Sequence, residues 1–356
     1  MKKIIQNIRN HVRQLFPRKS VVRKLNFKLT KIDKAILFVD TPTNGNLGDQ
    51  AIAYATKRYL KEKFPNYAII EIPNTEINSS IKTIKKNISK FDIAIWNGGG
   101  NVGNLYPFDE VSRWNFLKQF PQLPFIMCPQ SVFFSDDAAG HKFLKSSKYH
   151  YDRANQASFF LREKKSFDYM KKNFSLKKQF LVPDIVFTLE KHSFPLTRIS
   201  RNNDVLTLLR SDIEKGNFDL TQFLDVLKKR QMNITYSDTF KANKFVSEAN
   251  RKCLLYDFWG EMCTYKLIVT DRLHGMVFAY LTKTPAIVFP NNNWKISSTY
   301  DTWLKNCGYI ELIDSDDLKV FEDKIERVTN TSLKYANVAA NFDNFEKEIR
   351  KYLRYE

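Results

Sequence analysis

Short apolar runs rich in β-branched and aromatic residues recur along this chain of 356 residues, and segments with helical periodicity separate them. The runs span residues 35–40, 68–72, 92–96, 125–128, 158–161, 180–182, 204–209, 233–236, 267–270, 286–289 and 309–312. Regular alternation of strand and helix predicts parallel sheets flanked by helices. The predicted fold class is therefore α/β, and the length is sufficient for two domains with separate cores.

The polar segment 190–204 contains few apolar residues and one proline, so it is the best candidate for a linker. We therefore expect an N-terminal α/β domain over residues 31–195 and a C-terminal α/β domain over residues 196–335. The last residues, 336–356, carry a charged helical pattern, and we expect a helix there that can pack back across either domain. A basic arm over residues 1–30 precedes the first domain.

The basic arm contributes much of the positive charge of the chain, whose net charge is +19. Residues 1–34 contain eleven Lys or Arg and a single acid, Asp33. An apolar face along the helical pattern consists of Ile4, Ile8, Val12 and Leu15. Two interpretations stay open: the arm lies on an anionic membrane surface, or its apolar face packs on the core. Nucleic acid is not expected as a partner, because no zinc-finger or RNA-recognition signature is present.

Several sequence features indicate the compartment. No run of about 18 or more apolar residues is present, so we expect no membrane-spanning helix. Charged residues interrupt the apolar residues at the N-terminus, which argues against a secretory signal. The four cysteines show neither a disulfide-framework spacing nor a zinc-ligand spacing. We expect a cytoplasmic protein, attached peripherally to the inner face of the membrane if the arm binds lipid.

The strongest local signal lies in residues 269–285, where an arginine and a histidine stand between a buried strand and a helix. Arg272 and His274 follow the strand, and apolar residues at helical spacing run from Leu273 to Leu281. The start of a helix has unpaired backbone N–H groups and a field that favours negative charge. We therefore expect an anion at this corner, although a single histidine is more often structural.

Polar motifs also follow other predicted strands, at the sheet edge where α/β folds bind ligands. Asn46 and Asp49, in a loop that contains glycines, can contact sugar hydroxyls or cap the following helix. The glycines of "WNGGGN" allow either a close approach to a ligand or a demanding turn. Arg162 suits a phosphate or carboxylate, although it can equally form a surface ion pair with Glu163. We expect these motifs to meet in a cleft between the two domains.

Six segments resemble, in order, the motifs of the polysaccharide pyruvyl transferase family. They are "NGNLGDQAI", "NGGGN", "CPQS", "LREKKS", "VPDIVF" and "TDRLHGMVFAYLTKTPAIVFPNNNWKISSTYDTWL". The resemblance covers residues 35–304, its last block is the specific one, and "CPQS" departs from the commoner glycine or serine variants. It implies two Rossmann-like domains that face a cleft, a glycosyltransferase B-like architecture. It also implies transfer of pyruvate from phosphoenolpyruvate to two hydroxyls of one sugar, which forms a cyclic ketal.

The resemblance also implies roles for individual residues. Donor binding falls to Arg272, Leu273 and Lys295, with either Arg162 or Arg210 as a second arginine. His274 is the expected acid, because two neighbouring anions stabilise its protonated form. The acceptor sugar is expected to contact Asn46, Asp49, Gly98, Gly99, Gly100, Asn101 and Gln130. No metal or other cofactor is expected besides the co-substrate phosphoenolpyruvate, because the cations of the protein offset the donor charge.

Two other classes of function fit the same residues. A glycosyltransferase of similar fold would bind the diphosphate of a nucleotide-sugar with the same arginines and helix N-terminus. A non-catalytic protein of polysaccharide assembly could keep the fold without the chemistry. The acceptor, a glycan that is free or lipid-linked, is not specified by the sequence.

Overall fold

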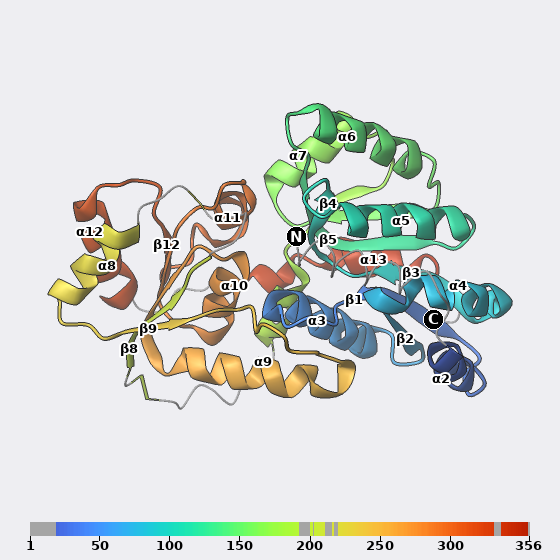
Figure 1. The fold of residues 1–356 in the computed structure, drawn as a ribbon, viewed down its shortest axis with the longest axis horizontal. Helices are drawn as coiled ribbons and strands as arrows, with labels where there is room; N and C mark the ends of the chain where they lie inside the picture. The colour runs from blue at the N-terminus through green and yellow to red at the C-terminus, as the bar shows by residue number, and fades with distance from the viewer. Residues whose placement is uncertain are drawn as a thin grey trace.

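The computed structural model describes residues 19–191, 200, 201, 203–210, 216, 220–330 and 336–354. In this part of the chain two parallel sheets form two α/β units side by side (Figure 1). Each of the eleven predicted strands is present, and most strand ends lie within two residues of the prediction. The structure adds one strand, β4 (Gly99–Gly103), which the apolar pattern did not predict.

The first sheet has the strand order β2-β1-β3-β5-β6-β7, and β4 pairs with β5 beside this path. Its strands are β1 (Ala35–Thr41), β2 (Ala68–Pro73), β3 (Phe91–Trp96), β5 (Phe125–Phe133), β6 (Ala157–Leu161) and β7 (Gln179–Leu181). The helices of this unit are α2 (Lys19–Leu29), α3 (Leu47–Lys63), α4 (Ile77–Lys86), α5 (Pro107–Gln119), α6 (Ala138–Tyr151) and α7 (Lys164–Asn173). All seven residues of β1 are buried, because helices cover both faces of the sheet.

The second sheet has the strand order β12-β11-β10-β8-β9, and all its pairings are parallel. Its strands are β8 (Asn203–Leu208), β9 (Ile234–Ser237), β10 (Tyr265–Thr270), β11 (Ala286–Val288) and β12 (Ile310–Leu312). The helices of this unit are α8 (Leu220–Lys229), α9 (Glu248–Cys263), α10 (Leu273–Thr282), α11 (Lys295–Thr299) and α12 (Leu318–Asn330). The parallel sheets confirm the predicted α/β class.

Strand β5 continues past the predicted end of its apolar run. Its first half pairs with β3, and its second half pairs with β4 through Gly99 opposite Gln130 and Gly103 opposite Phe133. Gly103 has a φ of 116°, and a Cβ atom there would lie 1.8 Å from the carbonyl oxygen of Phe133. Only glycine therefore allows the chain to return to the sheet directly after the loop at Gly98.

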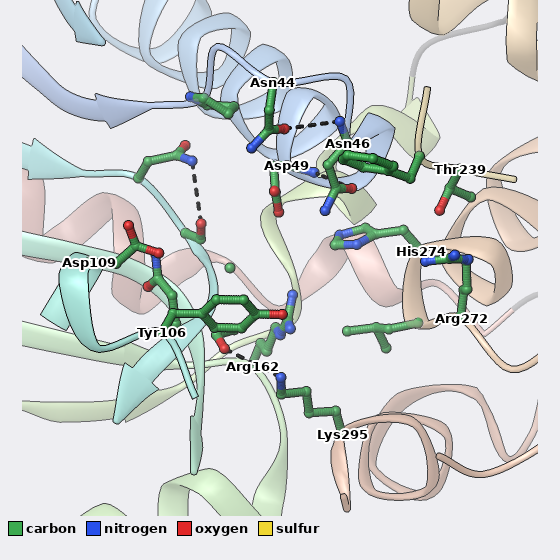
Figure 2. Close-up of a pocket in the computed structure, with 18 of the residues that line it drawn as sticks. Asn44, Asn46, Asp49, Tyr106, Asp109, Arg162, Thr239, Arg272, His274 and Lys295 are labelled. Carbon is green, nitrogen blue, oxygen red and sulfur yellow. Dashed lines mark hydrogen bonds between the residues drawn. The ribbon is translucent and has the colours of Figure 1, made fainter. Parts of the chain in front are cut away.

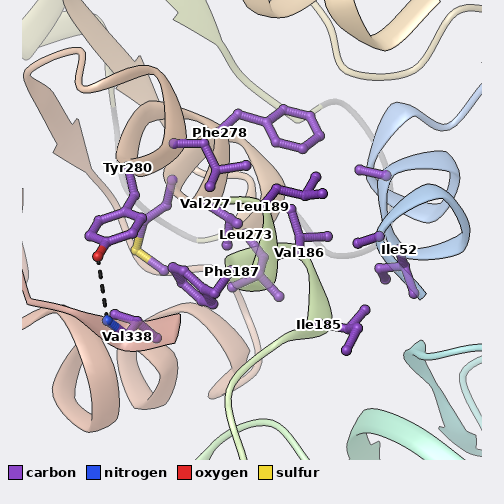
Figure 3. Close-up of a cluster of buried hydrophobic side chains, with 14 of the residues drawn as sticks. Ile52, Ile185, Val186, Phe187, Leu189, Leu273, Val277, Phe278, Tyr280 and Val338 are labelled. Carbon is purple, nitrogen blue, oxygen red and sulfur yellow. Dashed lines mark hydrogen bonds between the residues drawn. The ribbon is translucent and has the colours of Figure 1, made fainter. Parts of the chain in front are cut away.

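An apolar cluster joins the two units (Figure 3). The short segment η3 (Ile185–Lys191) lies between α3 and α10, so that Val186 and Leu189 are buried between Ile52 and Leu273. A buried ion pair adds to this interface: Arg251 of α9 lies 2.6 Å from Glu71 of β2 and donates to Gln50 at 2.7 Å. The shared core and the ion pair fix the orientation of the two units.

The C-terminal helix α13 (Asp343–Arg350) packs back on the first unit. The Phe345 ring contacts those of Phe160 and Tyr59, with centroid distances of 4.9 and 5.5 Å. Glu348 accepts a hydrogen bond from Ser158 at 2.8 Å. The sequence did not indicate which domain the C-terminal helix covers. In the structure α13 covers the first unit.

Parts of three predictions lie outside the described residues: the apolar face of Ile4, Ile8, Val12 and Leu15, most of the linker 190–204, and the boundary at residues 195 and 196. The domain limits therefore stay predictions. Within the described part of the basic arm, α2 buries Leu25 and Leu29 against the first unit. Among the residues that the structure describes, no helix combines the length and the hydropathy that a membrane crossing requires.

Candidate active site

A cavity of about 340 Å³ opens between the two units, where the carboxyl ends of strands from both sheets meet (Figure 2). Every predicted site residue except Gln130 lines it. The first unit contributes Asn46, Asp49, Gly98, Gly99, Gly100, Asn101 and Arg162. The second unit contributes Arg210, Arg272, Leu273, His274 and Lys295. The structure therefore brings together residues that are up to about 250 positions apart, as the parallel topology requires.

Arg162 is a buried cation at the end of β6, with only 3 % of its surface exposed. Its Nη1 donates to Oδ2 of Asp184 at 2.7 Å, and its Nε donates to the Ser131 hydroxyl at 2.8 Å. Its Nη2 faces the glycine loop, because a Cβ atom on Gly100 would lie 3.0 Å from it. The guanidinium is thus held firmly, with one edge directed toward the cavity (Figure 2).

Asp184 links Arg162 of the first unit to His274 of the second. Its Oδ2 lies 3.5 Å from Nε2 of His274, and its Oδ1 accepts from the Val186 amide at 3.0 Å. Burial raises the pKa of Asp184, but His274 and Arg162 together outweigh burial and hold this pKa well below its usual range. Asp184 is therefore a buried carboxylate that positions both an arginine and the histidine.

Sequence reasoning did not single out Asp184. Its signal was its place in "VPDIVF", one of the segments that carry the family resemblance. The segment looked like an ordinary apolar strand end, and nothing local distinguished the aspartate from a turn residue. Its contacts depend on two residues that are distant in the sequence.

The N-terminus of α10 is open toward the cavity. Arg272 occupies the N-cap position, and no side chain among the described residues caps the helix. The Nη2 atom of Arg272 donates to Asp238 at 2.7 Å, whereas its buried Nε atom has no acceptor among the described residues. An uncapped helix N-terminus preceded by an arginine is a site that favours an anion.

The N-terminus of α3 reaches the same cavity from the first unit, and it is capped. The Asn46 side chain accepts from the backbone N–H groups of Gly48 and Asp49, at 3.0 and 3.5 Å. Capping, one of the two roles predicted for Asn46, is therefore present, and the residue also lines the cavity. Asp49 lies in the first turn of α3, where the helix dipole favours a carboxylate.

The two helix ends meet at Gly48 and His274. A Cβ atom on Gly48 would lie 2.3 Å from Nδ1 of His274, a distance that no real contact allows. The absence of a side chain at Gly48 thus lets the imidazole approach α3 closely. This contact explains the second glycine of "NGNLGD", because a side chain there would displace the imidazole.

Lys295 carries a cation from the second unit to the glycine loop of the first. Its Nζ donates to the carbonyl oxygen of Gly100 at 3.3 Å, and its side chain is almost fully buried. Both candidates for the second arginine line the cavity, but they differ in surroundings. Arg162 contacts the Asp184–His274 pair, whereas Arg210 donates its backbone N–H to Asp271 at 2.7 Å.

Two carboxylates that the sequence did not single out lie in the wall formed by the first unit, Asp40 and Asp109. Burial raises the pKa of Asp40 well above its usual value, and the neighbouring Asp109 raises it further. Burial also raises the pKa of Asp109, although Arg113 opposes the shift. Asp40 adopts a left-handed φ of 69°, which is uncommon for a residue other than glycine. The cavity therefore has cations toward one end and carboxyl groups toward the other.

Two residues lie elsewhere than the sequence suggested. Gln130 is fully buried behind the glycine loop, where its Nε2 donates to the Asn97 carbonyl at 3.0 Å and its Oε1 accepts from the Asn101 amide at 3.4 Å. It supports the loop and does not line the cavity. Glu163 is also fully buried and accepts from Ser131 at 2.9 Å. Its Oε2 lies 3.9 Å from Nε of Arg162, so the ion pair is present, but it is buried and not on the surface.

Comparisons with known proteins agree with this geometry. A family described as polysaccharide pyruvyl transferase matches residues 46–293. General stress protein 30 of Bacillus subtilis (strain 168) is 32 % identical over 313 residues, which is 87 % of this chain and 89 % of that protein. Pyruvyl transferase 1 of Schizosaccharomyces pombe is 28 % identical over 309 residues, 80 % of this chain and 74 % of that one.

Solved structures resemble the fold. The UDP-GlcNAc 2-epimerase of Methanocaldococcus jannaschii matches with a TM-score of 0.51 and 12 % identity, over 89 % of this chain and 99 % of that one. At this identity the likeness concerns architecture alone. It confirms the predicted glycosyltransferase B-like arrangement of two Rossmann-like domains that face a cleft.

Proposed function

The chain belongs to the polysaccharide pyruvyl transferase family, and from this premise we propose that it moves pyruvate from phosphoenolpyruvate to two hydroxyls of one sugar. The product is a cyclic ketal on a capsular or other exopolysaccharide, or on its lipid-linked precursor. The sugar itself is left open, as is the pair of hydroxyls. Membership in the family makes the protein a transferase, and the identity of the donor is the proposal.

One observation carries this proposal: four cationic or protonatable side chains from both units converge beside an uncapped helix N-terminus. They are Arg162, Arg272, His274 and Lys295. Phosphoenolpyruvate carries a phosphate and a carboxylate on one three-carbon unit, so it needs several cations close together. The buried Nε atom of Arg272 has no hydrogen-bond acceptor among the described residues, which suits a group that binds a ligand.

In the proposed reaction His274 donates a proton to the methylene carbon of phosphoenolpyruvate. The methylene becomes a methyl group, and the neighbouring carbon becomes an oxocarbenium-like centre. A sugar hydroxyl adds to this centre and loses its proton. The C–O bond to phosphate then breaks, a second hydroxyl of the same sugar attacks, and its proton leaves with inorganic phosphate. Each ketal therefore releases one phosphate, and the proton from the first hydroxyl restores the acid.

The opposite end of the cavity suits the acceptor. Asp40, Asp49 and Asp109 offer carboxyl oxygens, and Asn44, Asn46 and Asn97 offer amide groups. Such a mixture of acceptors and donors matches sugar hydroxyls, which act as both. Asp184 does not line the cavity and serves instead to orient His274 and Arg162, in the way that a carboxylate orients a catalytic histidine in other enzymes.

Calorimetric titration with phosphoenolpyruvate tests the donor. The wild-type chain is expected to bind it saturably, and Arg272→Ala is expected to weaken binding by roughly 10- to 100-fold, since a charge-assisted hydrogen bond is lost. Arg230→Ala is the matched control, because Arg230 pairs with Glu322 and Glu326 on the surface and does not line the cavity.

UDP- and CMP-sugars are titrated alongside. Binding of a nucleotide-sugar with no response to phosphoenolpyruvate would replace the proposal by glycosyl transfer. Binding of neither donor, in a chain that is folded, would favour the non-catalytic class. A coupled assay for inorganic phosphate, with acceptor glycans added, separates pyruvyl transfer from simple donor binding.

A further inference from the structure

The outer end of the first unit carries a strongly basic surface, formed by α2 and α4 and the segments that follow them. The two helices pack against each other, with Leu25 and Leu29 of α2 buried in the same apolar cluster as Ile77 and Ile84 of α4 (Figure 1). Residues 19–34 and 77–90 contain ten Lys or Arg and one acid, Asp33. The proposed chemistry does not account for this excess of positive charge, because the surface does not line the cavity between the units.

The cations of this surface are not neutralised by the protein. Those that point outward are Arg23, Lys24, Lys28, Lys31, Lys82, Lys85 and Lys86. Within the described part of the chain none of them forms an ion pair with a carboxylate, although Lys85 donates to Gln119 at 2.6 Å. Some exposed lysines elsewhere on the molecule do have acidic partners, such as Lys228 with Asp225 and Lys164 with Asp168. The surface therefore presents a concentrated positive charge.

Apolar side chains stand among these cations. Phe27 of α2 is 63 % exposed and Ile88, just after α4, is 41 % exposed. Ser20, Arg23, Lys24 and Phe27 line a shallow hollow in the same surface. The Nζ atom of Lys31 lies 4.4 Å from the centre of the Phe27 ring. Exposed aromatic and aliphatic groups within a field of lysines are typical of surfaces that bind the headgroup layer of a membrane.

We propose that the α2–α4 surface binds an anionic lipid membrane. The cations bind lipid phosphates, and Phe27 and Ile88 enter the boundary between headgroups and acyl chains. Two helices that are distant in the sequence, α2 and α4, carry the contact, so that it does not depend on residues 1–18. Membrane binding by this surface does not depend on the proposed chemistry, since any enzyme with a lipid-linked substrate would benefit from membrane binding.

Vesicle co-sedimentation of the full-length protein tests the proposal. The probes are vesicles of phosphatidylglycerol and phosphatidylcholine in equal parts, and vesicles of phosphatidylcholine alone. Wild type is expected to bind the anionic vesicles, and added salt should weaken binding because it screens the charges. The variant K24E/K28E/K82E/K86E should bind at least about 100-fold more weakly, at roughly fivefold per cation.

A matched variant, K142E/K145E/K172E/K177E, changes the net charge equally on and beside α6 and α7, and its binding should stay close to that of wild type. Phe27→Ser should weaken binding several-fold and leave the salt dependence unchanged. Thermal melting, together with turnover of a water-soluble acceptor, confirms that each variant is folded.

Three results would overturn the proposal. The α2–α4 variant could bind as tightly as wild type, which would assign any membrane contact to residues 1–18. The two quadruple variants could lose binding equally, which would reduce the effect to net charge. The wild-type protein could bind duplex RNA and ignore anionic vesicles, which would identify a different partner for this surface.

Discussion

Helices α3 and α10 begin at the same cavity, one from each unit, but their first turns differ in almost every respect. Asn46 caps α3, and Asp49 places a carboxylate in its first turn. No side chain among the described residues caps α10, and Arg272 and His274 flank its first residue. A helix N-terminus attracts negative charge in both cases. In α3 the protein itself supplies the negative groups, whereas in α10 they are left to a ligand.

This difference indicates which end of the cavity binds which substrate. A self-capped helix end with a carboxylate repels a phosphate and suits neutral sugar hydroxyls. An uncapped end with neighbouring cations attracts the donor. Gly48 and His274 join the two ends, so the acid of the proposed reaction stands where donor and acceptor must meet.

The largest expected effect is on turnover in His274→Ala. Loss of the proton donor should lower kcat by about 10²- to 10⁴-fold, the usual contribution of a general acid, while phosphoenolpyruvate still binds through the remaining cations. Steady-state release of inorganic phosphate measures it. His141→Ala is the control, since the His141 side chain is 68 % exposed and lies outside the cavity. Normal turnover in His274→Ala would contradict the role of His274 as the acid, and with it the proposed difference between the two helix ends.

Asp184→Asn should give the largest change in stability. The substitution keeps the shape but leaves the buried Arg162 with only the more distant carboxylate of Glu163, 3.9 Å away, so the free energy of unfolding should fall by about 3–5 kcal/mol. Chemical denaturation measures it. Asp168→Asn removes an exposed partner of Lys164 and should cost less than about 1 kcal/mol. Equal losses in the two variants would contradict a buried charged link between the units.

The pH dependence of stability sharpens the same prediction. The folded-state pKa of Asp184 lies below its unfolded value, so the stability it provides is present above about pH 4 and is lost as the pH falls further. Asp40 behaves in the opposite sense, because its raised pKa makes ionisation at higher pH costly to the folded state. The difference in melting temperature between wild type and Asp184→Asn should therefore shrink in acid. For Asp40→Asn, wild type should be the less stable protein at neutral pH.

Gly48→Ala tests the contact between the helix ends. The added methyl group overlaps the imidazole, so His274 must move, and a displacement on the order of 1 Å can lower kcat by about 10²-fold. In the double variant Gly48→Ala/His274→Ala the loss should not exceed that of His274→Ala alone. Additive losses would mean that Gly48 acts through the loop and not through the histidine.

The smallest effect is expected for Asn46→Ala. The change removes the cap of α3 and should lower the free energy of unfolding by about 0.5–2 kcal/mol. If the capped end faces the acceptor, KM for the glycan should rise while the Kd for phosphoenolpyruvate stays constant. Asn87→Ala, which affects the C-terminal end of α4 away from the cavity, is the control for stability. A weakened affinity for phosphoenolpyruvate would show that the donor also contacts α3.

Much of the fold could be predicted because central parallel strands are continuous apolar runs. Strand β4 could not, since Gly99, Gly100 and Gly103 carry no strand signal of their own. It forms because β5 continues through Pro129, a residue whose missing N–H normally ends a central strand. Here the extended strand β5 offers a partner that no local pattern in the glycine segment indicates.

The candidate site was also predictable only in part. Arg272 and His274 were predictable because one short motif places both at a helix start. Asp184 was not, because its role comes from Arg162 and His274, which only the fold brings beside it. Gln130 was expected to contact the acceptor, but the sequence does not reveal that its side chain points behind the loop. Contacts across the fold, rather than residue types, account for what was missed.

Helix α13 has a consequence for the order in which the protein can fold during synthesis. The core of the first unit includes Phe345 and Ile349, which follow the entire second unit in the chain. The ribosome must therefore finish the second unit before the first can complete its core. Until then the surface that receives Phe345, around Tyr59 and Phe160, stays exposed on the nascent chain. A chaperone that shields apolar surface would act at this stage of synthesis, and the two units would mature together.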